Sequence, residues 1–245
     1  MKKYFDIRYE FSVEEVHRRI DETVMKDEKG YICVADGNIL QMVHNDAAYR
    51  EVVDGALFSI CDSSWVPKMV KRIYSEEYKH YTGSDIFRDI TEMKKHRQLF
   101  LGTSQEILDG LRTELTKIDD SYADMHYEAL PYCKVEDFDY AAIADTVRED
   151  NPDIIWVALG APKQERFMNL LLPHLERGVM IAVGAVFNFR CGLESAPRRA
   201  PEWVLKCHME FVYRLFSEPK KQWQRCRLIL KTLPSIYRKE KNNKK

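Results

Sequence analysis

The residues best suited to chemistry form the run GAPKQE at positions 160–165. An apolar stretch, residues 154–159, comes directly before the run and is typical of a buried parallel strand. Pro162 stands where a first helical turn should begin, and apolar residues then recur at helical spacing. We therefore expect the run at the carboxyl end of a strand and on the first turn of a helix. Open α/β sheets bind ligands there, and free backbone N–H groups favour phosphate.

Side chains of this run could contact such a ligand. Lys163 is a candidate phosphate ligand, and the amide of Gln164 can both donate and accept hydrogen bonds with a sugar or uracil. Gly160 and Glu165 belong to the same candidate binding site. The alternative is that Lys163 and Glu165 only form the solvated start of a helix.

Carboxylates follow two other expected strands. Asp62 comes after residues 57–61, and a carboxylate at the carboxyl end of a strand can act as a general base. It could equally cap the next helix or sit in a turn. Asp36 comes after residues 31–35, where Asp36-Gly37 could also be a plain turn that ends the strand.

Two glycine-containing segments are further candidates. Residues 82–85, TGSD, predict a helix start with Ser84 as the N-cap and Asp85 favourable to the helix dipole. Gly102 and Thr103 follow the expected strand 98–101 and form a candidate phosphate or nucleotide loop. The sequence has no G-x-G-x-x-G to support NAD binding.

A second block of residues begins at Gly184. It contains GAVFNF at 184–189, then Gly192, RAPEW at 199–203, and a stretch with YRL at 213–215 and EP at 218–219. With residues 160–165 it resembles the WecG/TagA/CpsF glycosyltransferase family. Members of that family carry G-A-P-K-Q-E, G-x-x-F-D/N-F-x-x-G, R-A-P-x-W and E-W-x-Y-R-L-x-x-E-P in this order. The resemblance is strongest over residues 153–219 and extends more weakly back to about residue 38.

The resemblance implies an inverting glycosyltransferase. It would move an N-acetylhexosamine-type sugar, N-acetylmannosamine or a related one, from a UDP-sugar to a polyprenyl-diphosphate-linked N-acetylglucosamine acceptor. The product would serve cell-surface polysaccharide or teichoic acid synthesis. The resemblance also implies no cofactor, no essential metal, no nucleic-acid partner, association into a homo-oligomer, and a cytoplasmic enzyme peripheral on the inner face of the plasma membrane.

Residue roles carry over by matching motifs. Asp62 matches the proposed catalytic base, and the other matched positions are expected to bind donor or acceptor: Asn38, Gly83, Gln164, Asn188, Arg199 and Arg214. Asn188 stands where the family commonly has Asp, and the arginines would be diphosphate ligands. Two positions depart from the family. Asp36 replaces the Thr of a T-x-N motif, which adds negative charge near a diphosphate site, and Ser63 replaces the Gly that follows the catalytic Asp.

Charge is distributed unevenly along the 245 residues, although the formal net charge is only −1. Residues 198–245 contain 14 Lys and Arg against 4 Asp and Glu. Aromatic and apolar residues alternate with these charges, so the segment predicts a basic amphipathic helix at an anionic membrane surface. The alternative is a helical hairpin that packs on the body with solvated charges. The six cysteines lack metal-binding spacing and indicate a reduced, cytosolic protein. No signal peptide, membrane span or D-x-D metal motif is evident.

The elements that must position these residues alternate along the chain. Strands are expected at 31–35, 57–61, 98–101, 126–130, 154–159 and 179–186; helices at 12–25, up to 42, 84–95, up to 115, 139–150 and 162–175. This alternation predicts an α/β fold with a Rossmann-like, mainly parallel sheet flanked by helices. We expect a catalytic domain over residues 1–197, a hinge near 197–201, and a helical basic appendage over 198–245 with helices at 200–217 and 220–231.

Two other functions are open from the residues alone. The first is a nucleotide- or membrane-binding module without transferase activity, which the Asp36 departure keeps open. The second is an RNA-binding protein that uses the basic end, but the chain lacks the glycine-rich and aromatic signatures of common RNA-binding modules.

Overall fold

The computed structural model describes residues 2–196 and 219–244, and its centre is one eight-stranded sheet. The strand order is β1-β2-β4-β3-β8-β7-β5-β6, and every neighbouring pair is parallel except β1 with β2. The strands are β1 Lys3–Tyr4, β2 Ile7–Glu10, β3 Lys29–Ala35, β4 Phe58–Cys61, β5 Gln98–Gly102, β6 His126–Glu128, β7 Ile154–Ala158 and β8 Gly178–Ala182. The predicted α/β class with a mainly parallel sheet is confirmed.

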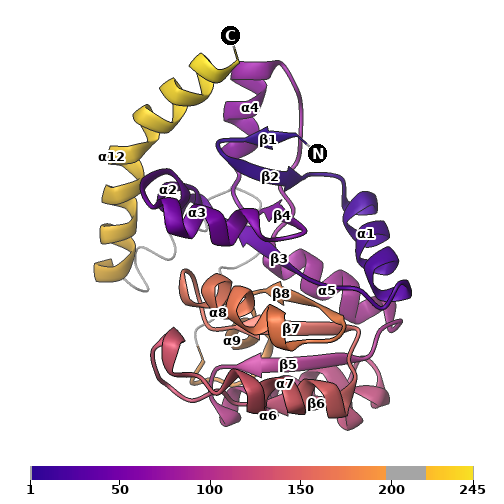
Figure 1. Cartoon of the computed structure of the whole chain (residues 1–245). Coiled ribbons are helices and arrows are strands. Elements are labelled where there is room, and N and C mark those ends of the chain that lie inside the picture. The colour runs from indigo at the N-terminus through magenta and orange to yellow at the C-terminus, as the bar shows by residue number, and fades with distance from the viewer. Residues whose placement is uncertain (1, 197–218, 245) are drawn as a thin grey trace.

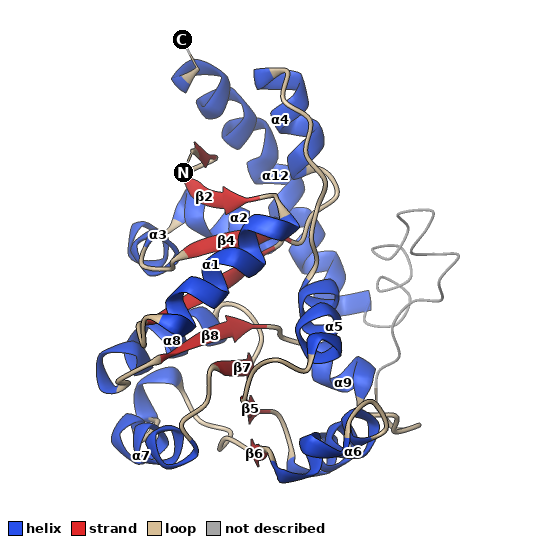
Figure 2. Cartoon of the chain, turned by 90° about the vertical axis from the view of Figure 1, so that its right-hand side faces the viewer, coloured by secondary structure: helices blue, strands red, loops and turns tan. Residues whose placement is uncertain are grey.

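Helices cover both faces of the sheet (Figure 2). They are α1 Val13–Met25, α2 Gly37–Asn45, α3 Ala47–Asp54, α4 Val66–Tyr74, α5 Gly83–Met93, α6 Gln105–Thr116, α7 Tyr140–Asp150, α8 Lys163–Leu171, α9 Val186–Arg190 and α12 Pro219–Asn243. Short 3-10 turns lie at Asp120–Asp124, Val135–Asp137 and Leu172–His174. Figure 1 shows the order of these elements along the chain.

Alternation along β7 explains why helices cover both faces. Ile154 and Trp156 join the core with α1, α5 and α6, whereas Ile155 and Val157 join the core with α7 and α8. All of them are fully buried, as expected for a central parallel strand whose successive side chains point to opposite faces. A third core, under α2, α3 and α4, completes the other end of the sheet.

Several predicted boundaries were wrong. The last strand ends at Ala182 and not at residue 186, because Gly184 turns the chain at φ 55° and α9 begins at Val186. The N-cap of α5 is Thr82 and not Ser84, because the Thr82 side chain accepts from the Asp85 N–H in a capping box. The strands β1 and β2 and the helices α3 and α4 were not predicted at all.

The helix α12 begins at Pro219, where a break was predicted, but it does not end at residue 231. It continues through Pro234 to Asn243. Its second half is held to the body: Ile236 lies in the core under α2 and α4, and the Tyr74 hydroxyl donates to Glu240 Oε1 at 2.7 Å. Figure 1 shows α12 beside α2 with its carboxyl end near α4. The predicted hinge and the predicted helix 200–217 lie outside the described residues. No described helix is long and apolar enough to cross a membrane.

Candidate active site

The carboxyl edge of the sheet collects most of the predicted site residues. In the register of the sheet Ala35 lies opposite Cys61, and Gly102 lies opposite Ala158. Because these strands are parallel, the segments that follow them leave the sheet at the same edge. The polar residues predicted after β3, β4, β5 and β7 therefore share one side of the molecule.

Asp62 is the first residue after β4. Its backbone N–H donates to the carbonyl of Ala35 at 3.1 Å, which fixes it beside the turn that follows β3. Its side chain is half-buried. The alternative that Asp62 caps the next helix is wrong, because the N-cap of α4 is Trp65. Asp62 therefore places a carboxylate at the carboxyl end of β4, a position that suits a general base.

Asp36 caps α2. Its Oδ1 accepts from the backbone N–H groups of Asn38 and Ile39, both at 2.9 Å. The alternative of a plain turn is therefore wrong, because Asp36 is the N-cap of α2 and Gly37 is the first residue of that helix. Two N–H donors partly offset the negative charge that this residue adds to the site. Asn38 lies on the first turn of α2 and is partly exposed.

Gln164 and Glu165 lie inside the protein, so the prediction of a solvated helix start is wrong for Glu165. Gln164 Oε1 accepts from the Gly160 N–H at 3.0 Å, and Gln164 Nε2 donates to Glu165 Oε1 at 2.9 Å. The Tyr49 hydroxyl, from α3, donates to Glu165 Oε2 at 3.1 Å. Burial raises the pKa of Glu165 to about 7, although the hydrogen bonds to its carboxylate lower it.

Lys163 turns to the loop after β6. Its Nζ donates to the carbonyl of Cys133 at 2.5 Å and lies 4.7 Å from the centre of the Phe138 ring and 5.7 Å from that of Tyr132. The Tyr132 ring itself is fully exposed. The Cys133 carbonyl takes one of the three N–H donors of Lys163, and binding of phosphate through the others stays a prediction.

Two glycines fix the shape of this edge by close approach. A Cβ on Gly102, whose φ is 110°, would lie 2.7 Å from the Ala158 carbonyl oxygen, so only glycine lets β5 leave the sheet here. Thr103 follows with φ 58°, and Ser104 caps α6. A Cβ on Gly83 would lie 3.2 Å from Val34 Cγ1, which brings the start of α5 against β3.

The remaining predicted residues lie near the end of β8 or outside the described chain. Asn188 is on α9 and is partly exposed. Arg199 and Arg214 lie outside the described residues.

Four residues at this edge were missed as members of the site. Tyr49 contacts Glu165, as described, and gave no signal because α3 itself was not predicted. Gly184 follows β8, and the position of a Cβ there would be 3.6 Å from Gln164 Oε1. Its place in the motif block of residues 184–189 was the available signal. Trp65 and Ile229 both approach Gly37, at 3.1 and 3.5 Å from the position of a Cβ. The helix α12 therefore reaches the turn that follows β3.

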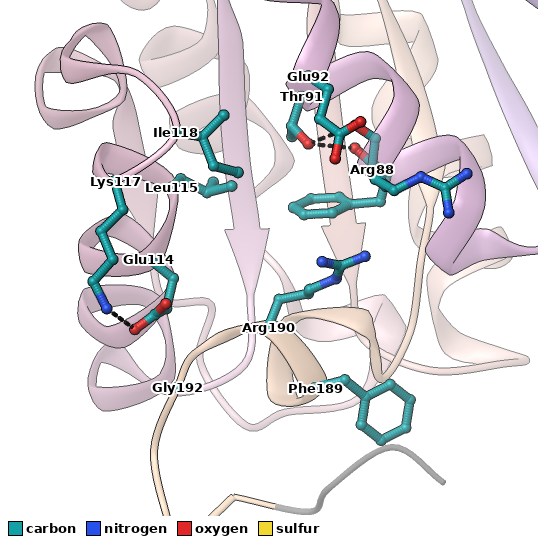
Figure 3. Close-up of a pocket in the computed structure, with 11 residues that line it drawn as sticks. Arg88, Thr91, Glu92, Glu114, Leu115, Lys117, Ile118, Phe189, Arg190 and Gly192 are labelled. Atoms are coloured by element: carbon teal, nitrogen blue, oxygen red, sulfur yellow. Dashed lines mark hydrogen bonds and ion pairs between the residues drawn. The ribbon is translucent and has the colours of Figure 1, made fainter. Parts of the chain in front are cut away.

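A pocket of about 410 Å³ lies away from this group, between α5, α6 and α9 (Figure 3). Charged side chains line it, with Glu114 paired to Lys117 and Arg190 pointing from α9 toward α5. None of the predicted site residues that the structure describes lines it. In the described part of the chain no three His, Cys, Asp or Glu residues gather closely enough to hold a metal ion.

Comparison with known proteins covers nearly the whole chain. Residues 3–245 match the family described as "Glycosyl transferase WecG/TagA/CpsF family". An N-acetylglucosaminyldiphosphoundecaprenol N-acetyl-beta-D-mannosaminyltransferase of Bacillus subtilis is 27% identical over 228 residues, 89% of this chain and 86% of that protein. Proteins of the same name from Bacillus spizizenii and Staphylococcus aureus strain MW2 are 26% and 24% identical, over 92% and 78% of this chain and 86% and 73% of their own lengths.

Proposed function

Because the chain belongs to the WecG/TagA/CpsF glycosyltransferase family, we propose that it transfers an N-acetylhexosamine from a UDP-sugar to a polyprenyl-diphosphate-linked N-acetylglucosamine. The names of its relatives support N-acetylmannosamine as the sugar and an undecaprenyl-diphosphate-linked acceptor. The observation that carries the proposal is the half-buried carboxylate of Asp62 at the strand end, on the same edge as the segment of residues 160–165.

In the proposed reaction Asp62 takes the proton of the acceptor hydroxyl as that oxygen attacks the anomeric carbon. The bond from this carbon to the UDP oxygen breaks, and the configuration inverts. Backbone N–H groups at the start of α8, with Lys163, Arg199 and Arg214, stabilise the charge on the departing diphosphate. One N–H donor of Lys163 is bonded to the Cys133 carbonyl, and two donors remain for the diphosphate.

The position of the Asp36 carboxylate favours an active enzyme over a binding module without transferase activity. Its carboxylate already accepts from two backbone N–H groups of α2, so its charge is directed into the helix start and opposes a bound diphosphate less strongly.

We also propose that α12 holds the enzyme at the inner face of the plasma membrane. Trp223 and Leu230 are 65% and 68% exposed, and the exposed cations Arg227 and Lys231 lie on the same stretch of helix. Each such cation contributes about 1 kcal/mol near an anionic bilayer. The boundary between residues 197 and 198, the homo-oligomer and the lack of a metal requirement stay predictions.

The test is release of UDP by the purified full chain. A panel of UDP-N-acetylhexosamines is offered with a short-chain polyprenyl-diphosphate N-acetylglucosamine, with EDTA and with added Mg²⁺. We expect release that needs the acceptor, is strongest with one donor and is insensitive to EDTA. Absence of release with every donor would refute the proposed activity.

A further inference from the structure

A fully buried carboxyl group lies beneath the loop that joins β7 to α8. Glu165 is 0% exposed, and in the described part of the chain its carboxyl oxygens accept hydrogen bonds from the neutral side chains of Gln164 and Tyr49. The nearest cation in sequence, Arg166, instead pairs with Asp46 at 3.2 Å. A buried carboxyl without a cation costs stability unless it is hydrogen-bonded or neutral. Because Glu165 does not face solvent, its carboxyl group does not serve solubility, and its burial indicates another role.

Hydrogen bonds run from α3 through Glu165 to the backbone of the loop. Tyr49 donates to one carboxyl oxygen, Gln164 donates to the other, and the Gln164 carbonyl accepts from the Gly160 N–H. Gln164 is only 4% exposed. The Gln164 side-chain carbonyl and NH₂ group are therefore each hydrogen-bonded within the protein. The amide is poorly placed to bind a sugar through both groups at once.

Within the described residues, the outer side of the loop is open at Gly160. Gly160 adopts φ 75°, and no atom lies within 4 Å of the position that a Cβ would take. On the inner side, Gln164 Oε1 accepts from the Gly160 N–H and lies 3.6 Å from the position that a Cβ on Gly184 would take. Ala161 packs on the core under α2, α3 and α4, so the Gln164 amide fixes the Gly160 end of the loop in particular.

We propose that Glu165 is a positioning residue, which holds the Gln164 amide against the Gly160 N–H and so fixes the loop that binds the nucleotide diphosphate of the donor. This role rests on the proposed function, because it assumes that a UDP-sugar binds at this loop. It differs from the solvated helix start and from the direct ligand role that the sequence suggested for Glu165.

Hydrogen-bond chemistry decides which substitutions keep this arrangement. Gln164 Nε2 can only donate, so the facing oxygen of Glu165 must accept whether the carboxyl is charged or neutral. The Tyr49 hydroxyl can donate or accept, so it tolerates a proton on the other oxygen. Glu165→Gln can place its carbonyl toward Gln164 and its NH₂ toward Tyr49, and it therefore mimics the neutral acid. Glu165→Ala removes both bonds.

The groups around the carboxyl from other elements are acidic or neutral. Asp36 at the start of α2, Cys33 on β3 and Tyr49 on α3 all interact electrostatically with it. The charge of Asp36 favours the neutral carboxyl, which is the form that the Glu165→Gln variant imitates, whereas the hydrogen bond from Tyr49 favours the charged form.

Calorimetry of UDP binding to the full chain tests the proposal. We expect Glu165→Ala to raise the Kd of UDP about tenfold or more, since small displacements of a binding loop have large effects, and Glu165→Gln to stay within about threefold of wild type. Met168→Ala is the matched control, because Met168 is equally buried on the same helix but belongs to the core under α7 and α8. It should lower the Tm and leave the Kd unchanged.

Amide hydrogen exchange gives a second readout that needs no ligand. The Gly160 N–H should exchange about tenfold faster or more in Glu165→Ala and at the wild-type rate in Glu165→Gln and Met168→Ala. If Glu165→Ala does not fold, Tyr49→Phe, which removes one of the two bonds, should still speed exchange of the same amide. An unchanged Kd and unchanged Gly160 exchange in the folded Glu165→Ala or Tyr49→Phe variant overturns the proposal. Failure of the wild type to bind UDP would instead refute the proposed function.

Discussion

Asp62 and Ala35 are joined by a backbone hydrogen bond of 3.1 Å, from the Asp62 N–H to the Ala35 carbonyl. The bond extends the β3–β4 pairing one residue beyond the strand, so the proposed base is held by the sheet itself and not by a loop. Its neighbour across the sheet is the capping residue Asp36. Two carboxylates thus follow neighbouring strands side by side, and the Asp36 carboxylate caps α2.

Asp62→Asn should abolish transfer and spare binding. The amide keeps the size of the side chain but cannot take a proton, so we expect kcat to fall about 100-fold or more, while the Kd of UDP and the Tm stay at wild-type values. Acceptor-dependent UDP release measures the effect. Asp109→Asn, at an exposed position on α6, is the matched control. Wild-type turnover in Asp62→Asn would remove Asp62 as the base.

Asp36→Ala should destabilise the protein by about 1 kcal/mol, because α2 loses its N-cap. For a chain of this size the loss corresponds to a Tm about 2–4 °C lower. Asp36→Thr should stay close to wild type in thermal unfolding and retain turnover, since Thr also caps helices. Equal losses of Tm in the two variants would contradict this explanation of the Asp36 side chain.

Stability should fall as the pH rises through the titration of Glu165. The carboxyl has a pKa of about 7 in the fold against an ordinary value of 4.5, so the folded protein binds this proton more tightly than the unfolded chain. The neutral form therefore stabilises the fold below about pH 4.5, and this contribution is lost between there and pH 7. Above pH 7 the loss is complete, and the shift corresponds to about 3 kcal/mol.

Chemical denaturation at several pH values checks this sign. The free energy of unfolding of Glu165→Gln minus that of wild type should increase by about 3 kcal/mol from pH 4 to pH 8, since the variant does not titrate there. A difference that is constant with pH would show that the native carboxyl titrates normally.

Membrane binding should depend on the exposed face of α12. Replacing Trp223, Leu228 and Leu230 together by Ser should release the protein from anionic vesicles without changing its Tm, because all three side chains are exposed. Co-sedimentation with vesicles of anionic and of neutral lipid measures binding, and high salt should weaken it. Ile236→Ser, at the buried position of the same helix, should lower the Tm instead. Undiminished binding by the triple variant would contradict a membrane role of this face.

The sequence predicts the central sheet well because its strands are apolar runs bounded by turn residues. β3, β5, β7 and β8 are of this kind, and each was found within a few residues of its expected place, though the last was predicted four residues too long. β1 has only two residues and carries no local signal, and α4 begins at Val66 without a side-chain cap, so only Pro67 in its first turn marks its start. Local sequence patterns predict only elements that carry such a pattern. An element such as β1 forms instead through contacts with residues that are distant in sequence.

The sequence likewise predicted part of the candidate site, namely the residues that follow apolar strands. Asp62 and residues 160–165 could be placed at strand ends, because a parallel sheet brings its carboxyl ends to one edge. The burial of Glu165 could not be predicted, since it depends on Tyr49, which lies 116 residues away in the chain. The approach of Ile229 to Gly37 depends in the same way on how α12 lies on α2.

That approach bears on how a water-insoluble substrate is handled. In the proposed membrane-bound state, Leu228 and Leu230 face the bilayer, and Ile229 between them lies 3.5 Å from the position that a Cβ on Gly37 would take, beside the turn between β3 and α2. The bilayer would then lie next to the carboxyl edge of the sheet. The long polyprenyl tail would have no need of a hydrophobic tunnel in the protein: it could stay dissolved among lipids while only its sugar-bearing head is lifted to Asp62.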